Sequence, residues 1–304
     1  MLRMTICQWN IDGLQPNIYS LNSLLEDFSP DVVNLQETNL KRAKASSTAN
    51  QLDETYTINV NCKDDQAILS EQLSKIDSLL FKSKGTASLW KIDSPLQNAP
   101  VATPTFQMSA NRTTMENVSI LNISCYFPTT GNDKDQDYLE YLEMLAAFLK
   151  KELREDEELI ITADFNIHLE ETEKPSSDER IQAYKTFLID FNLMQTRPAG
   201  DTFFCKKEAS TSSSKLDWIV HSKGIKVEEI KTIEMDELAH SSDHIPVLIK
   251  INLKFKKKDR EDNLEEEETN KNFNKTKKID WEKEVDKNLY KVLLHFFITR
   301  LTLN

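Results

Sequence analysis

Ser242-Asp243-His244 stands directly before Ile245–Leu253, an apolar run that predicts a β-strand. An acid beside an imidazole at the start of a strand adds little to packing, and the pair alone is a weak signal. The signal is strengthened because other polar clusters along the chain also lie at the ends of apolar runs. These clusters are Trp9-Asn10-Ile11-Asp12-Gly13, Gln36-Glu37-Thr38, Tyr126 with Pro128, Ala163-Asp164-Phe165-Asn166 and Lys215-Leu216-Asp217.

The order of the apolar runs predicts an α/β fold. Met4–Trp9 has strand character, Asn17–Phe28 has apolar residues at helical spacing, and Val32–Leu35 is typical of a buried strand. A strand, a helix and a strand at this spacing are the usual opening of a layered α/β fold. Further strands are expected at Tyr56–Val60, Gly85–Ile92, Val118–Tyr126, Leu159–Thr162, Thr202–Cys205, Leu216–Val220, Val227–Ile233 and Ile245–Leu253, helices at Ile68–Leu80, Tyr138–Leu153 and Arg180–Asp190, and a polar loop at Ser210–Ser214.

The apolar pattern ends at Leu253. Residues 254–278 are a mixed-charge run with almost no apolar residues, a composition typical of disordered chain, and 281–303 are too few to fold alone. We therefore expect one folded domain at residues 1–253, followed by a charged linker and short tail at 254–304.

Composition sets limits on compartment and partners. No leading signal segment and no apolar run of about 18 residues is visible, so no membrane association is expected. The four scattered cysteines favour buried thiols over disulfides, which indicates the nucleus or the cytoplasm. The net charge of −12 gives no help to nucleic-acid binding, but residues 133–179 hold 16 acids against 5 bases and so account for most of it.

The residue types at the strand ends suit metal-assisted hydrolysis of a phosphodiester, which needs a hard cation, an activated water and donors for the developing charge. Glu37 with Asn10 and Asp243 offers oxygen ligands of the kind that Mg²⁺ prefers. Asp164 and Asn166 are two residues apart and could position water. His244 could donate to a phosphate oxygen if a carboxylate such as Asp217 fixes its tautomer, and Tyr126 offers a hydroxyl.

Each of these residues also has a structural explanation when it is taken alone. Asn10 and Asp12 could form a turn before Gly13, and Glu37 could cap a helix. Tyr126 could be a core aromatic, Asp164 could cap a turn, Asp217 could pair with Lys215, and His244 could be a satisfied buried imidazole. Their joint occurrence at six strand ends favours the catalytic interpretation.

The same residues resemble the endonuclease/exonuclease/phosphatase superfamily between Met4 and about Leu253. Residues 9–14 (WNIDGL) and 30–38 (PDVVNLQET) resemble its abasic-endonuclease branch. Residues 202–203 (TF), the serine-rich stretch, 216–220 (LDWIV) and 241–244 (SSDH) resemble the endonuclease domain of non-LTR retrotransposons. Residues 278–282 (KIDWE) resemble the segment that joins this domain to a reverse transcriptase.

The resemblance implies a four-layered α/β sandwich of two packed mixed β-sheets flanked by helices, with a Mg²⁺ site for which Mn²⁺ can substitute. It implies that Glu37 is the principal metal ligand, supported by Asn10 and Asp243, with Asp12 as a second contact. It further implies that Asp164 activates water, that Asn166 and Tyr126 hold the phosphate, and that His244 and Asp217 form an acid/base pair. Departures from the family pattern are Ala163, where glycine is usual, and Gly85, which lacks a second glycine.

The function expected from the resemblance is a Mg²⁺-dependent DNA endonuclease of retrotransposon origin that nicks duplex DNA. Two alternatives stay open: a phosphatase acting on inositol phosphates or a related small phosphoester, and an inactive transposon remnant. DNA is the expected partner, and no stable protein partner is predicted. The candidate phosphate contacts are few, which predicts weak binding with a shallow salt dependence; they are Lys41, Arg42, Lys44, Lys206 and Lys207, with Arg180 as a further candidate.

Truncation of the chain after Leu253 should leave thermal stability nearly unchanged, because 254–304 offers little apolar surface to bury. We expect a change in melting temperature of less than about 5 °C, measured by circular dichroism on both chains. A larger fall would show that Trp281 or Phe296 packs on the domain.

Overall fold

The computed structural model describes residues 2–62, 85–129, 135–169, 177–207, 210–234 and 241–253, without the side chains of 2, 42, 178, 206, 207, 210 and 211. All of them fall in one compact unit, Met1–Lys257. The expected helix at Ile68–Leu80 and the expected linker and tail lie outside the described residues.

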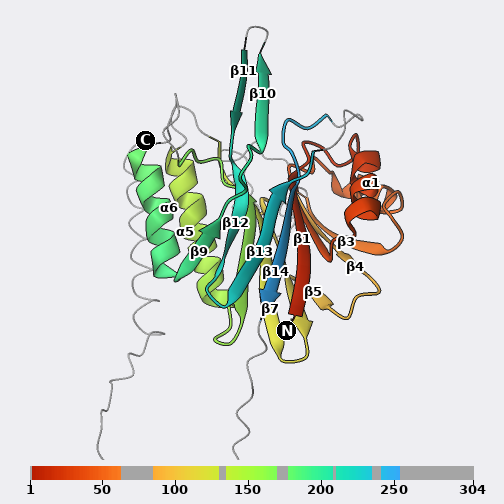
Figure 1. Cartoon of the computed structure of the whole chain (residues 1–304), viewed down its shortest axis with the longest axis horizontal. Helices are drawn as coiled ribbons and strands as arrows, with labels where there is room; N and C mark the ends of the chain where they lie inside the picture. The colour runs from red at the N-terminus through yellow and green to blue at the C-terminus, as the bar shows by residue number, and fades with distance from the viewer. Residues whose placement is uncertain are drawn as a thin grey trace, which may run out of the picture. The chain divides into compact units, whose positions relative to one another are not determined.

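The first sheet has six strands in the order β13-β14-β1-β2-β4-β3 (Figure 1). β1 and β2 are parallel and the other neighbours are antiparallel, so the sheet is mixed. The strands are β1 (Leu2–Asn10), β2 (Val32–Gln36), β3 (Tyr56–Asn61), β4 (Thr86–Lys91), β13 (Ile225–Thr232) and β14 (Val247–Leu253).

The second sheet also has six strands, in the order β5-β6-β7-β8-β12-β9. Only the pair β7 and β8 is parallel. The strands are β5 (Gln97–Val101), β6 (Met108–Met115), β7 (Val118–Tyr126), β8 (Glu158–Asp164), β9 (Leu193–Thr196) and β12 (Asp217–Ser222). A separate hairpin pairs β10 (Phe203–Lys207) with β11 (Ser210–Ser214).

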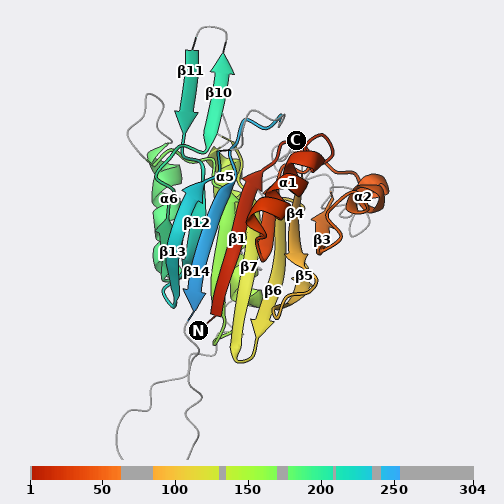
Figure 2. The same cartoon turned by 45° about the vertical axis from the view of Figure 1, so that its right-hand side comes forward.

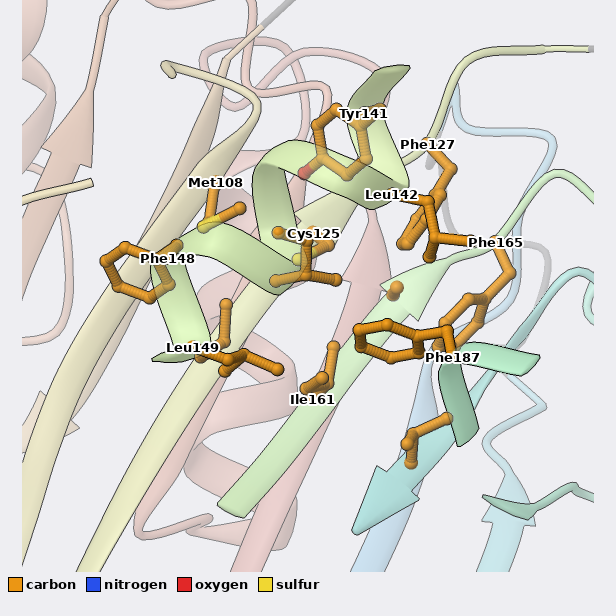
Figure 3. Close-up of a cluster of buried hydrophobic side chains, with 14 of the residues drawn as sticks. Met108, Cys125, Phe127, Tyr141, Leu142, Phe148, Leu149, Ile161, Phe165 and Phe187 are labelled. Atoms are coloured by element: carbon orange, nitrogen blue, oxygen red, sulfur yellow. The ribbon is translucent and has the colours of Figure 1, made fainter. Parts of the chain in front are cut away.

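Helices cover the outer face of each sheet, which gives the four layers that the family resemblance implied. α1 (Ile18–Phe28) packs on the first sheet, on the same side as the loop around α2 (Arg42–Ala49). α5 (Asp135–Glu152) and α6 (Asp178–Asp190) pack on the second sheet through the aromatic and aliphatic cluster drawn in Figure 3. A third cluster of aliphatic side chains, which includes Ile6, Ile120 and Ile249, fills one end of the space between the sheets.

Strand alternation explains how the remaining space between the sheets is filled. Side chains two apart on a strand share a face, so the face of β1 that carries Met4 and Ile6 goes on to Gln8 and Asn10. The inner faces of the central strands thus change from apolar to polar towards one end of the sandwich. β1 and β2 are parallel, as are β7 and β8, and the contact between Asn10 at the end of β1 and Asp164 at the end of β8 shows that both pairs finish at this end.

A buried layer of hydrogen-bonded polar side chains joins the two sheets; we call it the polar seam. Asn34 of β2 and Asn122 of β7 each donate to the other's carbonyl oxygen, both at 3.1 Å. Asn34 also donates to Thr162 at 2.8 Å, and Gln36 donates to Ser124 at 2.8 Å. Buried polar groups are costly unless paired, so these bonds fix the register of one sheet on the other.

The elements that the sequence pattern missed have physical explanations. β6 reads as polar because Ser109, Asn111 and Thr113 on its inner face belong to the seam or its surroundings. β5 is an edge strand, where Pro100 is tolerated, and α2 and β9 are short. The expectation of a polar loop at Ser210–Ser214 was wrong, because this stretch is β11, paired residue for residue with β10.

Substituting the seam amides should cost stability, because each leaves a buried partner without its hydrogen bond. Asn34→Ala and Asn122→Ala should each lower the free energy of unfolding by about 1–3 kcal/mol, and the double variant by less than the sum. Urea denaturation measures both effects, with Asn117→Ala in an exposed turn as the control. Additive losses would show that the two amides do not act as a pair.

Candidate active site

The predicted site residues meet at the polar end of the sandwich. Asn10 ends β1, Tyr126 ends β7, Asp164 ends β8, and Asp217 begins the antiparallel strand β12. Glu37 follows β2 directly, and His244 lies three residues before β14. The contacts among them show that these strand ends meet.

Asn10 is the central contact. It is 1% exposed, and its Nδ2 donates to Glu37 Oε1 at 3.2 Å and to Asp164 Oδ2 at 2.9 Å. The same nitrogen lies 3.4 Å from His244 Nε2. The backbone carbonyl of Asn10 accepts a hydrogen bond from Ser242 Oγ at 2.6 Å, which ties the end of β1 to the loop that carries His244.

His244 and Asp217 form a buried hydrogen-bonded pair. His244 Nδ1 donates to Asp217 Oδ2 at 2.8 Å, which leaves Nε2 pointing towards Asp164, 3.7 Å from its Oδ2. The other Asp217 oxygen accepts from Gln8 Nε2 at 3.0 Å, and its backbone NH donates to the Thr202 hydroxyl. Asp217 therefore fixes the orientation of the imidazole, as the sequence predicted.

The loop of His244 is held by residues that sequence reasoning did not assign. Trp9 Nε1 donates to the carbonyl of His244 at 3.1 Å, and the NH of His244 donates to Ser242 Oγ at 3.0 Å. The centroid of the Phe203 ring lies 5.0 Å from the centroid of the His244 imidazole. Gln8 could have been found from strand alternation, since it shares the inward face of β1 with Asn10. Strand alternation does not identify Thr202 or Phe203 as residues that support the site.

Electrostatic crowding sets the protonation of the site in the absence of a metal. Burial raises the pKa of Asp164 to about 8; the charge of His244 opposes this, and the negative charges of Asp217 and Glu37 add to it. Burial alone would lower the pKa of His244, but the charges of Asp217 and Asp164 outweigh it and raise that pKa to about 10. His244 is thus an imidazolium at neutral pH.

Asn166 and Tyr126 lie beside this cluster. The NH of Asn166 donates to Asp164 Oδ1 at 3.1 Å, and its Nδ2 donates to the carbonyl of Phe127 at 2.8 Å. Burial, followed by the charge of Glu37, raises the pKa of Tyr126, whose hydroxyl interacts with that carboxylate. Both side chains are almost completely buried.

Asp12 and Asp243 occupy the rim. The NH of Asp12 donates to Asn10 Oδ1 at 3.3 Å, and the Asp243 side chain is 52% exposed, with its Oδ1 3.9 Å from His244 Nε2. Asp12, Glu37 and Asn166 all have positive φ, at 41°, 52° and 47°. Such backbone strain in residues other than glycine is concentrated at functional sites, where the surrounding contacts maintain it.

The expected DNA contacts fall into two groups. Lys41 is exposed at the start of α2, and Lys44, also exposed, contacts Gln15 Oε1 at 3.4 Å through its Nζ. The side chains of Arg42, Lys206 and Lys207 lie outside the described residues.

A sequence profile of the Endonuclease/Exonuclease/phosphatase family matches residues 7–244, which include every site residue described above. The chain belongs to this family. The chain is therefore a phosphodiesterase with the expected fold. The resemblance to the endonuclease/exonuclease/phosphatase superfamily that was seen in the sequence is confirmed.

Three solved structures show the fold at low sequence identity. The AP endonuclease LMAP from Leishmania major matches with a TM-score of 0.59 at 15% identity, over 82% of this chain and 87% of its own. The endonuclease domain of TRAS1, a telomere-specific non-LTR retrotransposon, matches with a TM-score of 0.55 at 16% identity, over 82% and 99%. TDP2 from D. rerio, complexed with a single-strand DNA product, matches with a TM-score of 0.58 at 17% identity, over 83% and 100%. No curated protein sequence matches the chain.

The side-chain oxygen atoms gathered at the candidate site fit a divalent cation. Glu37, Asp164 and Asp217 are three buried acids in one cluster, and Asn10 and Asp243 add further oxygen atoms next to Glu37 and His244. Hard cations such as Mg²⁺ bind oxygen ligands of this kind. Asp164, Asp217 and His244 also bring one ligand atom each within 4.8 Å of one another. His244 Nδ1 is already bonded to Asp217 at 2.8 Å, which leaves only Nε2 of this ring to face a cation.

Asp217→Asn should lower the pKa of His244, because it removes the largest of the three charges, those of Asp217, Asp164 and Asp243, that raise this pKa against burial. The raised pKa contributes stability that is fully present below about pH 6.5, the ordinary value for histidine, and that is lost as the pH rises through about 10. In the metal-free protein, ¹⁵N chemical shifts of the ring should show no titration between pH 6 and 8, whereas in the variant the titration should move to lower pH. Titration of the unsubstituted protein at pH 6–7 would contradict the assignment.

Proposed function

We propose that the chain is a Mg²⁺-dependent DNA endonuclease that nicks duplex DNA. The observation that supports the proposal is the contact group of Asn10 with Glu37, Asp164 and His244, which gathers oxygen atoms suited to a cation, a carboxylate and an imidazolium. Phosphodiester hydrolysis needs these three functions within the reach of one phosphate.

Glu37 and Asn10, with Asp243 at the rim, would hold the cation, which supplies Lewis acidity and neutralises charge on the phosphoryl oxygens. Asp164, in its ionised form, accepts a proton from water. His244 donates from Nε2 to a phosphoryl oxygen while Asp217 holds Nδ1. Tyr126 and Asn166 position the phosphate.

The β10–β11 hairpin supports DNA over a small phosphoester as the substrate. Figures 1 and 2 show the β10–β11 hairpin standing out from the end of the sandwich that carries the site. The hairpin is anchored there because the NH of Phe204 donates to the carbonyl of Asp243 at 2.8 Å and the NH of Ile245 donates to the carbonyl of Thr202 at 2.7 Å. A projecting element at the mouth extends the contact surface beyond a single phosphate, which suits a polymer.

The structural neighbours support the same substrate class. They include AP endonucleases, a retrotransposon endonuclease domain and a protein bound to a DNA product. The acid-rich helix α5 covers the outer face of the second sheet, away from the first sheet.

We further propose a retrotransposon origin, a domain boundary near residue 253 and weak, shape-led DNA binding with a shallow salt dependence.

The protein should nick supercoiled plasmid in the presence of Mg²⁺ or Mn²⁺, and EDTA should abolish the reaction. Glu37→Ala should lower the rate at least about 100-fold, the loss seen when one electrostatic stabiliser of a transition state is removed. Gel conversion of supercoiled to relaxed plasmid measures the rate, and circular dichroism checks that the variant is folded.

Glu26→Ala, at an exposed position of α1, is the matched control and should nick at the unsubstituted rate. Activity of Glu37→Ala above a tenth of that rate would rule out Glu37 as the principal ligand. Turnover of a soluble inositol phosphate at equal enzyme concentration, with plasmid left intact, would favour the phosphatase. Inactivity on both substrates would favour a remnant that no longer turns over.

A further inference from the structure

Arg180 is a fully buried arginine at an unusual place. It lies in the first turn of α6, three residues after the N-cap Ser177, whose hydroxyl accepts a hydrogen bond from the NH of Arg180. A positive charge is unfavourable at a helix N-terminus, and glutamate or glutamine is the residue that favours capping at this position. The helix itself therefore does not explain an arginine here.

The guanidinium is satisfied on all sides. Nε and Nη2 each lie 3.1 Å from Asp135 Oδ1, and Nη2 also donates to the carbonyl of Thr129 at 3.4 Å. Nη1 donates to the carbonyls of Pro128 and Asn166, both at 3.1 Å. These are five contacts for the five N–H groups of arginine, a set that the three N–H groups of lysine cannot reproduce.

The carbonyl partners belong to the two loops that carry the residues proposed to hold phosphate. Pro128 and Thr129 follow Tyr126 after β7, and Asn166 follows Asp164 after β8. Asn166 has a positive φ of 47°, so a donor on its carbonyl stabilises a backbone conformation that the residue would otherwise rarely adopt. Arg180 thus joins the two loops through their backbone carbonyls.

We propose that Arg180 is a positioning residue, which holds Tyr126 and Asn166 in the geometry needed to bind the phosphodiester without touching the substrate. The inference rests on the proposed function. It also replaces the sequence-based suggestion that Arg180 contacts DNA, because a side chain with no exposed surface cannot reach a phosphate in solution.

A second arginine, whose side chain is 14% exposed, provides the matched control. Arg112 of β6 donates to Glu157 at 2.6 and 3.2 Å and to the carbonyl of Glu152 at 2.8 Å. Glu157 immediately precedes β8, whereas Asp164 ends it, so Arg112 lies at the opposite end of the second sheet from the site. Substituting it removes the same kind of interaction and disturbs no site residue.

The test compares Arg180→Lys with Arg112→Lys in the full chain. In plasmid nicking with Mg²⁺, measured well below both melting temperatures, Arg180→Lys should lower kcat at least tenfold with KM changed less than threefold. Arg112→Lys should stay within twofold of the unsubstituted rate. Because Arg180 acts through Asn166, adding Arg180→Lys to Asn166→Ala should cost less than threefold more. Equal activity of the two lysine variants, or additive losses in the double variant, would overturn the proposal.

Amide hydrogen exchange tests the positioning independently of activity. The NH of Phe127 donates to the carbonyl of Asp164 at 3.0 Å, and that of Asn166 donates to its carboxylate. Both amides should exchange at least tenfold faster in Arg180→Lys and be unchanged in Arg112→Lys. A uniform rise in exchange rate across the domain, or no rise at the two amides, would overturn the inference, whether or not the unsubstituted protein cleaves DNA. Failure of the unsubstituted protein to cleave DNA would by itself count only against the proposed function.

Should Arg180→Lys fail to fold, Asp135→Ala takes its place, because Asp135 is 43% exposed and its loss leaves the carbonyl contacts of Arg180 intact. The same two amides should exchange faster, by a smaller factor of about threefold or more. Exchange unchanged at both amides would overturn the proposal.

Discussion

The reciprocal amide pair of Asn34 and Asn122 is the constraint on which the site depends. It joins the two sheets through two hydrogen bonds of 3.1 Å in a buried environment. The sheets contribute different groups to the site: Asn10 and Glu37 come with the first, and Tyr126, Asp164 and Asp217 with the second. An apolar interface would allow one sheet to slide on the other at low cost, whereas paired polar groups permit one register only. The register of one sheet on the other therefore determines how accurately the site residues are positioned.

Much of the site followed from sequence because catalytic groups at strand ends interrupt apolar runs. Asn10, Glu37 and Asp164 were visible for that reason, and the structure brings them into contact. Period-two alternation also explains what was missed. β6 carries polar residues on a buried face, so its sequence is that of an exposed segment although the strand is central to the seam. Ser210–Ser214 forms a strand through backbone pairing with β10, which side-chain composition does not report.

Residues whose role behind the site was not predicted from the sequence act through other residues. Gln8, Thr202 and Arg180 touch Asp217 or the loops behind Tyr126 and Asn166. Their partners are distant in the chain: Gln8 and Asp217 are 209 residues apart. Only the folded pairing of strands shows such contacts. Pre-orienting groups of this kind matter because small displacements of catalytic groups have large effects on rate.

The strand order has a consequence for how the protein is made. β1, the first strand of the chain, lies between β2 and β14, the last described strand, and pairs with β14 along seven residues. During synthesis β1 must wait for about 240 further residues before its second neighbour exists, and His244 enters the site at the same late moment. Domains rich in such distant pairings fold slowly and expose unpaired strand edges until the last partner arrives. A ribosome-bound chain that ends before His244 thus holds Asn10, Glu37 and Asp164 but not the imidazole, so the contacts among these groups are completed only when the end of the domain is added.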